Sequence, residues 1–458
     1  MNIETTAQKI WSSSKLIVKT IVIGIIILIL QIPKSYVEDL IHERESRQTE
    51  AVNEVSSKWA AKQNLTGPIL VVPFYEYSDS NQRIRTKHYA YFLPDQLNIN
   101  STLNPIEKYR EIYKVMLYSS LIQVSGSFDN LDFTKFTVPP SNIAWNEAFV
   151  KINLSDLKGL NEEMKLKWND RLLTFSPQAS ESKNSTDALV AALNIMKPED
   201  LRGVHFSGQI NLNGSEELLF TPLGKSTNVT LSSKWPHPSF TGNSLPQTSE
   251  IANSGFQATW KSLAHKRNYP QQWFDDAYFI NTGANSGNTT IQDNTSNNIV
   301  SSSFGTDLFV PVNAYQKTTR SVKYAMLCIL LTFASFFLVE TANRKLIHPF
   351  QYGLIGLALI LFYTLLLSFS EYVGFNYSYL IASVATIALI GWFVKGILTS
   401  SRLTTLLVVI LTLIYSYIFT ILQLQDYSLL LGSIGLFITL AVIMHFSKRI
   451  QFSPAPTL

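Results

Sequence analysis

The sequence predicts a membrane α-helical bundle of six transmembrane helices, with a β-rich α+β domain inserted between helices 1 and 2. Three observations support this fold class. Six apolar segments have about the length that a bilayer crossing requires, roughly 20 residues each. Charged residues are concentrated in one long block between the first and second segments, and that block carries the period-two alternation of β-strands. Of the 458 residues, 46% are hydrophobic and only 15% are charged, against about 25% charged in a soluble domain.

The apolar segments begin with a candidate anchor and continue as a group near the C-terminus. Lys9, Lys15 and Lys19 precede the first segment, as they would in a signal peptide, but no small-x-small cleavage site follows it. We therefore expect an uncleaved anchor that ends at Pro33, with a cleaved signal as the alternative. Either one exports the residues that follow. The six segments cover residues 16–32, 324–341, 351–370, 377–394, 403–422 and 427–446.

Lys and Arg residues in the short connections set the expected orientation. They lie in the N-terminal tail, between segments two and three, between segments four and five, and in the C-terminal tail, while the alternate loops have none. Both termini are therefore expected in the cytoplasm. The expected layout is a cytoplasmic tail at 1–15, helix 1 at 16–33, an outer domain at 34–320, helices 2–6 within 321–447 and a cytoplasmic tail at 448–458.

The charges of the outer block nearly balance. Of the 33 acidic residues in the chain, 29 lie in this block, against 27 Lys and Arg. This balance gives no sign of a nucleic-acid surface. The single cysteine, Cys328, lies in the second apolar segment, so the block is not a disulfide scaffold. The acidic residues outside the block are Glu4, Glu340, Glu371 and Asp426.

The block is expected to begin with an amphipathic helix over 35–63, because apolar residues recur there at three-to-four spacing. Short helices are also expected near 105–120 and 185–193. The segment 281–305 is almost entirely Asn, Ser, Thr and Gly, which predicts a flexible loop. Strands are predicted at 65–74, 121–133, 149–160 and 255–264, with a meander of three more over 201–235.

Within that meander, Gly224-Lys225-Ser226 has the ending of a phosphate-binding loop. The motif also requires a glycine five residues before Gly224, where this chain has Leu219. We therefore interpret the tripeptide as a β-turn. No Gly-x-Ser-x-Gly occurs, and no two histidines have the spacing of a metal site. Asp275 and Asp276 are adjacent and are interpreted as a surface acidic pair. We expect no cofactor, no metal and no catalytic residue.

Two groups of residues remain as candidates for interaction or membrane coupling. In "WPHPSF", prolines flank His237 and aromatic residues stand at Trp235 and Phe240. The segment is either a rigid recognition edge or, as we favour, a strand exit packed by its two rings. The other group is the three acidic residues of the apolar part, because ionisable groups are costly there. Glu340 is expected to pair with nearby Arg344 and Lys345, and the other two, in short outer loops, are expected to reach water: Glu371 and Asp426.

Several stretches together resemble the CreD family of bacterial inner-membrane proteins, and they cover nearly the whole chain in the family's order. The resemblance implies an inner-membrane location, a periplasmic outer domain, a link to a two-component regulatory system and a part in envelope maintenance under cell-wall-active antibiotics. It supplies no catalytic residues. The stretches are "LTGPILVVPF" at 65–74, "LRGVHFSGQINLNGSEELLFTPLGKSTNVTLSSKWPHPSFTG" at 201–242, "HPFQYGLIGLALILFYTLLLSFSEYVGFNYSYLIAS" at 348–383 and "LQLQDYSLLLGSIGLFITLAVIMHFSKRI" at 422–450.

The sequence thus favours an inner-membrane protein that supports envelope integrity and the stress response through its periplasmic domain. Its partners are expected to be the lipid bilayer and envelope proteins, glycan or lipid, bound without catalysis. Two alternatives stay open. A membrane subunit of a transport or export complex would co-purify with an ATPase. A periplasmic enzyme acting on wall or lipid would need a cleft with converging polar groups.

Overall fold

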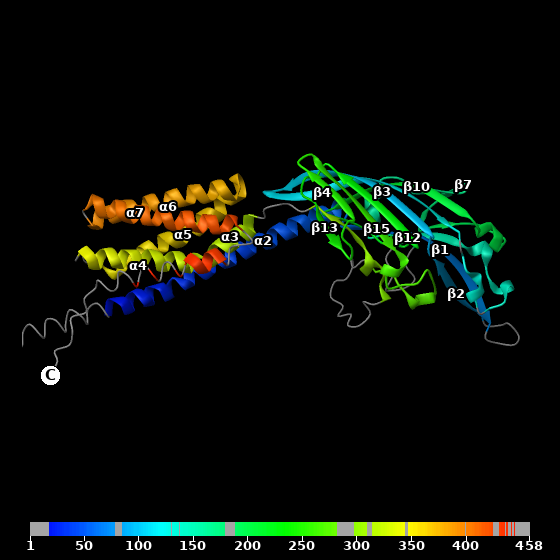
Figure 1. Cartoon of the computed structure of the whole chain (residues 1–458), viewed down its shortest axis with the longest axis horizontal. Helices are drawn as coiled ribbons and strands as arrows, with labels where there is room; N and C mark the ends of the chain where they lie inside the picture. The colour runs from blue at the N-terminus through cyan, green and yellow to red at the C-terminus, as the bar shows by residue number, and fades with distance from the viewer. Residues whose placement is uncertain are drawn as a thin grey trace, which may run out of the picture. The chain divides into compact units, whose positions relative to one another are not determined.

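The structure is a computed structural model. It describes residues 18–77, 85–129, 131–136, 138–178, 188–281, 297–308, 314–343, 347–398 and 400–424, with a few positions between 430 and 444. The chain divides into two compact units (Figure 1). One unit comprises Thr49–Pro311, and the other comprises Met1–Gln48 together with Val312–Leu458.

The chain enters the described region as one long helix, Val18–Trp59, which includes α2 (Gln31–Trp59). Sequence reasoning ended the first helix at Pro33 and began a second one shortly afterwards, and this break is wrong. The backbone N–H of Leu30 donates to Ile26 O at 2.9 Å, and that of Lys34 donates to Leu30 O at 3.2 Å. Because the ladder continues on both sides of the proline, the anchor and the predicted amphipathic helix belong to one continuous helix.

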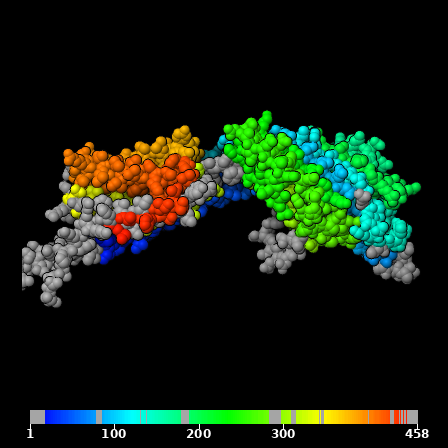
Figure 2. Space-filling model, in the orientation of Figure 1, coloured from blue at the N-terminus to red at the C-terminus, as the bar shows by residue number. Residues whose placement is uncertain are grey.

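The other apolar helices are α4 (Ala325–Asn343), α5 (Pro349–Val373), α6 (Phe375–Leu398) and α7 (Ser401–Gln423). A short helix, α3 (Ala314–Lys323), precedes α4 and is bent from it by 43°. Figure 2 shows α6 and α7 packed side by side in orange. Within the described residues, four helices are long and apolar enough to cross a membrane, or five if α3 and α4 form one span. The sixth predicted span, 427–446, lies mostly outside those residues.

The β-rich unit contains two sheets, counted over its described residues. In the nine-stranded sheet the order is β13 (Ser239–Gly242), β17 (Phe304–Asp307), β11 (Glu217–Phe220), β1 (Gln63–Tyr77), β5 (Phe149–Leu154), β9 (Ala188–Ala192), β8 (Ser176–Gln178), with β2 (Arg85–Phe92) on β1 and β16 (Gln272–Phe274) on β2. In the eight-stranded sheet it is β14 (Thr248–Ala252), β15 (Gly255–Leu263), β12 (Ser226–Ser233), β3 (Gln96–Arg110), β4 (Tyr113–Phe128), β10 (Val204–Ser215), β6 (Lys165–Trp168), β7 (Arg171–Thr174).

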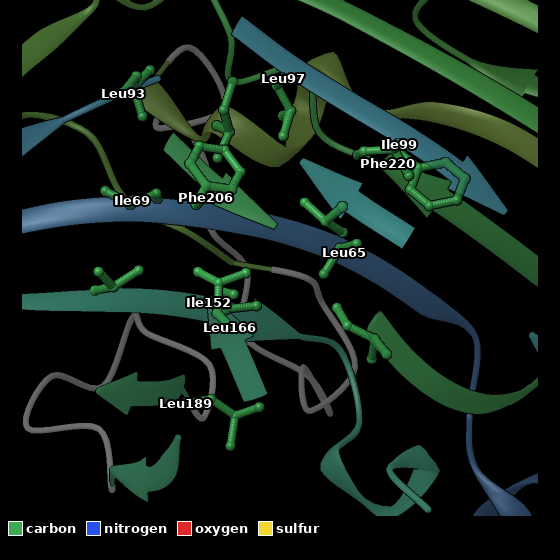
Figure 3. Packing of buried hydrophobic residues seen from close by; sticks show 14 of the residues in the cluster. Leu65, Ile69, Leu93, Leu97, Ile99, Ile152, Leu166, Leu189, Phe206 and Phe220 are labelled. Carbon is green, nitrogen blue, oxygen red and sulfur yellow. The ribbon is translucent and has the colours of Figure 1, made fainter. Parts of the chain in front are cut away.

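One hydrophobic core joins the two sheets. Figure 3 shows Ile69 of β1 and Ile152 of β5, from the nine-stranded sheet, near Leu97 of β3 and Phe206 of β10, from the eight-stranded sheet. Along β3 and β12, buried and exposed residues alternate regularly. These two strands of the eight-stranded sheet therefore turn one set of side chains into the core and the other set outward.

Several sequence predictions within this unit need correction. The two short helices are wrong: residues 105–120 form the ends of the β3–β4 hairpin, and 188–192 form β9. The strands predicted in 201–235 are present as β10, β11 and β12, but they are not a meander. β11 lies in the nine-stranded sheet, parallel to β1, while its neighbours in sequence lie in the other sheet.

The predicted loop 281–305 is only partly described, and its last part is packed. Residues 282–296 lie outside the described region. After them, a 3-10 helix at Ile299–Ser302 leads into β17, and the Ile299 side chain is fully buried. Ser303 Oγ accepts from Asn64 Nδ2 at 3.0 Å. This buried contact fixes the segment on the sheet, and polar composition alone gave no sign of it.

Candidate functional site

Among the described residues of the helical unit, the most enclosed carboxylate is that of Glu340, near the end of α4, which is 6% exposed. Its carboxylate forms an ion pair with Lys19 of the first helix. The hydroxyl of Tyr352 on α5 donates to Oε2 at 2.9 Å, and the backbone N–H of Ile347 donates to Oε1 at 3.2 Å. Lys19 Nζ also donates to Ile347 O at 2.7 Å. We refer to these four residues as the Glu340 cluster.

The Glu340 cluster joins the first helix to α4 and α5, which lie about three hundred residues further along the chain. Sequence reasoning paired Glu340 with Arg344 and Lys345, which lie outside the described residues, and it used Lys19 only as an orientation signal. The structure instead supplies a partner 321 residues away. Removing one member of such a pair leaves an uncompensated buried charge, which is strongly destabilising. The cluster therefore makes the contact between the first helix and α4 depend on both charges.

A second acidic contact lies at the other end of α5. Glu371 was predicted in a short outer loop with access to water, but it belongs to the last turns of α5 and its side chain is only 10% exposed. The connection to α6 is the single residue Gly374, whose φ of +78° suits glycine. The Tyr315 hydroxyl of α3 donates to Glu371 Oε1 at 3.1 Å, and Arg44 Nε of α2 lies 3.9 Å from the same oxygen.

The third acidic candidate, Asp426, lies outside the described residues, and its role stays a prediction. The two described acidic residues share one arrangement, because each connects α5 to two other helices. Glu340 does so at the start of α5 and Glu371 at its end. Glu340 and Glu371 thus serve as contacts between helices.

The "WPHPSF" segment follows β12 and runs into β13, and the rings of Trp235 and Phe240 pack inward. Trp235 is 8% exposed, and its indole N–H donates to His237 O at 3.0 Å. Phe240 makes edge-on contacts with Phe256 and Trp260, at centroid distances of 5.9 and 5.6 Å. The side chains of Trp235 and Phe240 therefore serve packing. A recognition role for His237 stays a prediction.

The Gly224-Lys225-Ser226 turn already uses the backbone groups that a phosphate would need. The N–H of Gly224 donates to Thr227 Oγ1 at 2.9 Å, and the N–H groups of Lys225 and Ser226 donate to Pro94 O and Asp95 O. A phosphate-binding loop requires several free N–H groups pointing into one concavity. These bonds support the interpretation of the tripeptide as a turn.

The histidine–carboxylate contact at the edge of the nine-stranded sheet was not expected. Asp275 follows β16 in a left-handed conformation with φ of 49°. Its Oδ1 accepts from the backbone N–H of Tyr89 at 2.9 Å, and its Oδ2 lies 2.8 Å from His88 Nδ1. The other ring nitrogen, Nε2, lies 3.5 Å from Glu76. Asp275 thus satisfies a backbone N–H of β2. In a catalytic triad, the second ring nitrogen of the histidine faces a nucleophile such as a serine hydroxyl. Here that nitrogen faces the Glu76 carboxylate instead.

Two carboxyls face each other across β11 and β17, where Glu217 and Asp307 are paired in register. Burial raises the pKa of both groups above their ordinary values. The Lys62 ammonium lowers both pKa values in part, and the Glu216 carboxylate raises them further. No group of three or more His, Cys, Asp or Glu side chains in the described part of the chain could hold a metal ion.

The four central strands of the eight-stranded sheet share an outward face of uniform composition. The four strands β12, β3, β4 and β10 each place three outward side chains in register, twelve in all. Eleven are uncharged and polar, one is Leu121, and none is charged. We call this set the polar face. Its cross-strand rows are Asn228–Asn98–Ser125–Ser207, Thr230–Asn100–Gln123–Gln209 and Ser232–Thr102–Leu121–Asn211.

Sequence reasoning missed the polar face because it depends on register. Segments such as "LNINST" and "LIQVSGS" show the alternation of apolar and uncharged polar residues. They do not show that four separate strands align these residues in rows. A count of charges at outward strand positions would have been the available signal.

Comparisons with known proteins agree with this architecture. The family model described as "Inner membrane protein CreD" matches residues 15–453. The Escherichia coli (strain K12) protein of that name is 30% identical to this chain over 434 residues, which cover 93% of this chain and 91% of the relative. The match extends through both the apolar helices and the inserted β-rich unit, so this chain belongs to the CreD family of inner membrane proteins.

Proposed function

We propose that this chain is anchored in the inner membrane and holds its β-rich unit in the periplasm. There it binds an envelope component through the polar face and so supports envelope integrity under stress. The role is binding or scaffolding rather than catalysis. Membership of an inner-membrane family and the four or five apolar helices support the anchor. The cationic short loops support the orientation, because Lys and Arg are retained on the cytoplasmic side.

The polar face is the observation that carries the binding role. It is a wide surface whose side chains are exposed or half-buried. Among the described residues, Asn100, Gln123 and Gln209 make no hydrogen bond with other protein groups through their side chains. These amides are therefore available to a partner, and each can both donate and accept.

Site-specific photo-crosslinking in intact cells tests this role. A photoreactive residue is placed at Gln123 or Gln209, and at Met196, which is 76% exposed and lies off the polar face. The cells are examined with and without a cell-wall-active antibiotic. We expect an adduct with an envelope component from Gln123 and Gln209 but not from Met196. The proposal fails if neither position on the polar face gives an adduct in either condition.

The buried Lys19–Glu340 pair favours a second candidate, a membrane subunit of a transport or export complex. Paired charges inside a helical bundle often mark a working part of a membrane protein. This candidate predicts that an ATPase co-purifies with the gently solubilised chain and is lost with Glu340→Gln. Recovery of the chain without any ATPase would argue against it.

A further inference from the structure

The composition of the polar face is unusual for a solvated surface. Protein surfaces carry charged residues at about a quarter to a third of their positions, so about three or four of twelve would be expected. The twelve positions have none. The neighbouring strands do carry charge: Lys261 of β15 lies beside Asn228, and Lys165 and Lys167 of β6 lie beside Gln209 and Ser207. The uncharged set is therefore a bounded patch, and lysines on the two flanking strands form its rim.

Two classes of partner fit this patch poorly. Protein interfaces are enriched at their centre in aromatic residues, Met and Arg, whereas the only apolar side chain here is Leu121, which is 36% exposed. Polyanions, including nucleic acids and phosphorylated lipid headgroups, are held by Lys and Arg. None of these cationic residues stands in the twelve positions.

A neutral polyhydroxylated polymer fits it well. Each amide has donors and an acceptor, and each hydroxyl can do both, which matches the hydroxyl and acetamido groups of an amino-sugar chain. Adjacent strands stand about 4.8 Å apart, so the middle row presents evenly spaced groups across the sheet. Asn228 Nδ2 already donates to Asn98 Oδ1 at 2.9 Å, an example of the side-chain geometry that the rows provide. The apolar side chain of Leu121 could lie against the C–H face of a sugar ring.

We propose that the polar face binds the glycan strand of the cell wall, with the lysines at its rim facing the carboxylates of the attached peptide stems. This inference rests on the proposed function and names its ligand class. The uncharged rows select a sugar backbone, and the rim charges select the acidic substituents that a wall polymer carries.

Co-sedimentation of the full-length chain with purified, protein-free peptidoglycan tests the inference. The chain is kept in a detergent without a sugar headgroup, so that the detergent does not compete. The variant Asn100→Ala/Gln123→Ala removes two neighbouring amides of the middle row. Its matched control, Asn146→Ala/Gln178→Ala, removes the same residue types at exposed positions elsewhere. Because all four side chains point outward, both variants should unfold at the wild-type temperature.

We expect the wild-type chain and the control to sediment with peptidoglycan, and the variant of the polar face to bind roughly tenfold more weakly. Soluble β-1,4-linked N-acetylglucosamine oligomers should compete, and purified lipopolysaccharide should not. The inference is overturned if the wild-type chain stays in solution, or if both variants lose binding equally. If peptidoglycan binding fails while Gln123 still crosslinks to an envelope protein or lipid in cells, the ligand class is wrong and the proposed function stands. If both experiments fail, both proposals fail.

Discussion

The Glu340 cluster predicts that one lysine in the first helix controls the opening of the helical unit. In Lys19→Met the carboxylate of Glu340 keeps its hydrogen bonds from Tyr352 and Ile347 but loses its only described counter-charge. The side chains of Lys19 and Glu340 are 15% and 7% exposed, so water compensates little. Breaking a buried pair by removing one partner costs about 3–5 kcal/mol. We expect the contact between the first helix and α4 to weaken by at least about 3 kcal/mol.

The single cysteine provides the assay. Cys328 lies on α4, the helix that carries Glu340, and it is 1% exposed. A small thiol reagent therefore reaches it only when the bundle opens, and the labelling rate follows the open population. A loss of about 3 kcal/mol raises that population, and hence the rate, by roughly 100-fold.

Two further variants make the test specific. Lys19→Met/Glu340→Gln removes both charges, and we expect it to return the Cys328 labelling rate to within about tenfold of wild type. Arg47→Met breaks the exposed Arg47–Glu43 pair of α2, whose side chains are 59% and 54% exposed. It should change the rate by less than about threefold, because such pairs are worth about 0.3–0.5 kcal/mol. The reasoning is refuted if Lys19→Met behaves like Arg47→Met.

Two other predictions concern packing and pH. On α5, an added Cβ at Gly356 would overlap Leu30 of the first helix, whereas one at Gly353 would meet nothing within 4 Å. Gly356→Ala should therefore destabilise the helical unit by about 1–3 kcal/mol, whereas Gly353→Ala should be neutral or stabilising. Both effects are measured by Cys328 labelling, and equal labelling rates for the two variants would contradict the packing. In the β-rich unit, burial raises the pKa of Glu217 and Asp307, so the folded state binds protons more tightly than the unfolded chain, and stability falls as pH rises through the raised values. In thermal unfolding, Glu217→Gln/Asp307→Asn should be more stable than wild type at pH 7. This gain in stability should disappear when the pH falls below the ordinary pKa values of the two carboxyls, 4.5 and 3.8. A gain that persists at such a low pH would point to another cause.

The helices were predictable because they are apolar on every side over a length that a strand or a soluble helix rarely reaches. Five of the six predicted spans correspond to described helices, and the sixth falls mostly outside the described residues. The boundary at Pro33 was wrong because proline disrupts only its own turn, and the flanking hydrogen bonds of Leu30 and Lys34 remain.

In the β-rich unit, individual strands could be recognised but their partners could not. Residues 105–120 contain Glu, Lys, Arg and Met, which favour helix locally, yet pairing between β3 and β4 overrides that preference. The strands β10, β11 and β12 are consecutive in sequence and alternate between the two sheets. The rows of the polar face and the contact between Lys19 and Glu340 arise from the same kind of long-range pairing. For that reason composition and periodicity did not reveal them.

The side of the membrane on which the β-rich unit lies is the claim on which the proposed role depends most. In a Cys328→Ser background, single cysteines are introduced at Ser249, on the exposed edge strand β14, and at Ser401, at the exposed start of α7. Intact cells are treated with a small membrane-impermeant maleimide. We predict labelling at position 249 in intact cells, and labelling at position 401 only after the inner membrane is permeabilised. Labelling at 401 in intact cells, with 249 protected until permeabilisation, would place the β-rich unit in the cytoplasm and contradict the account.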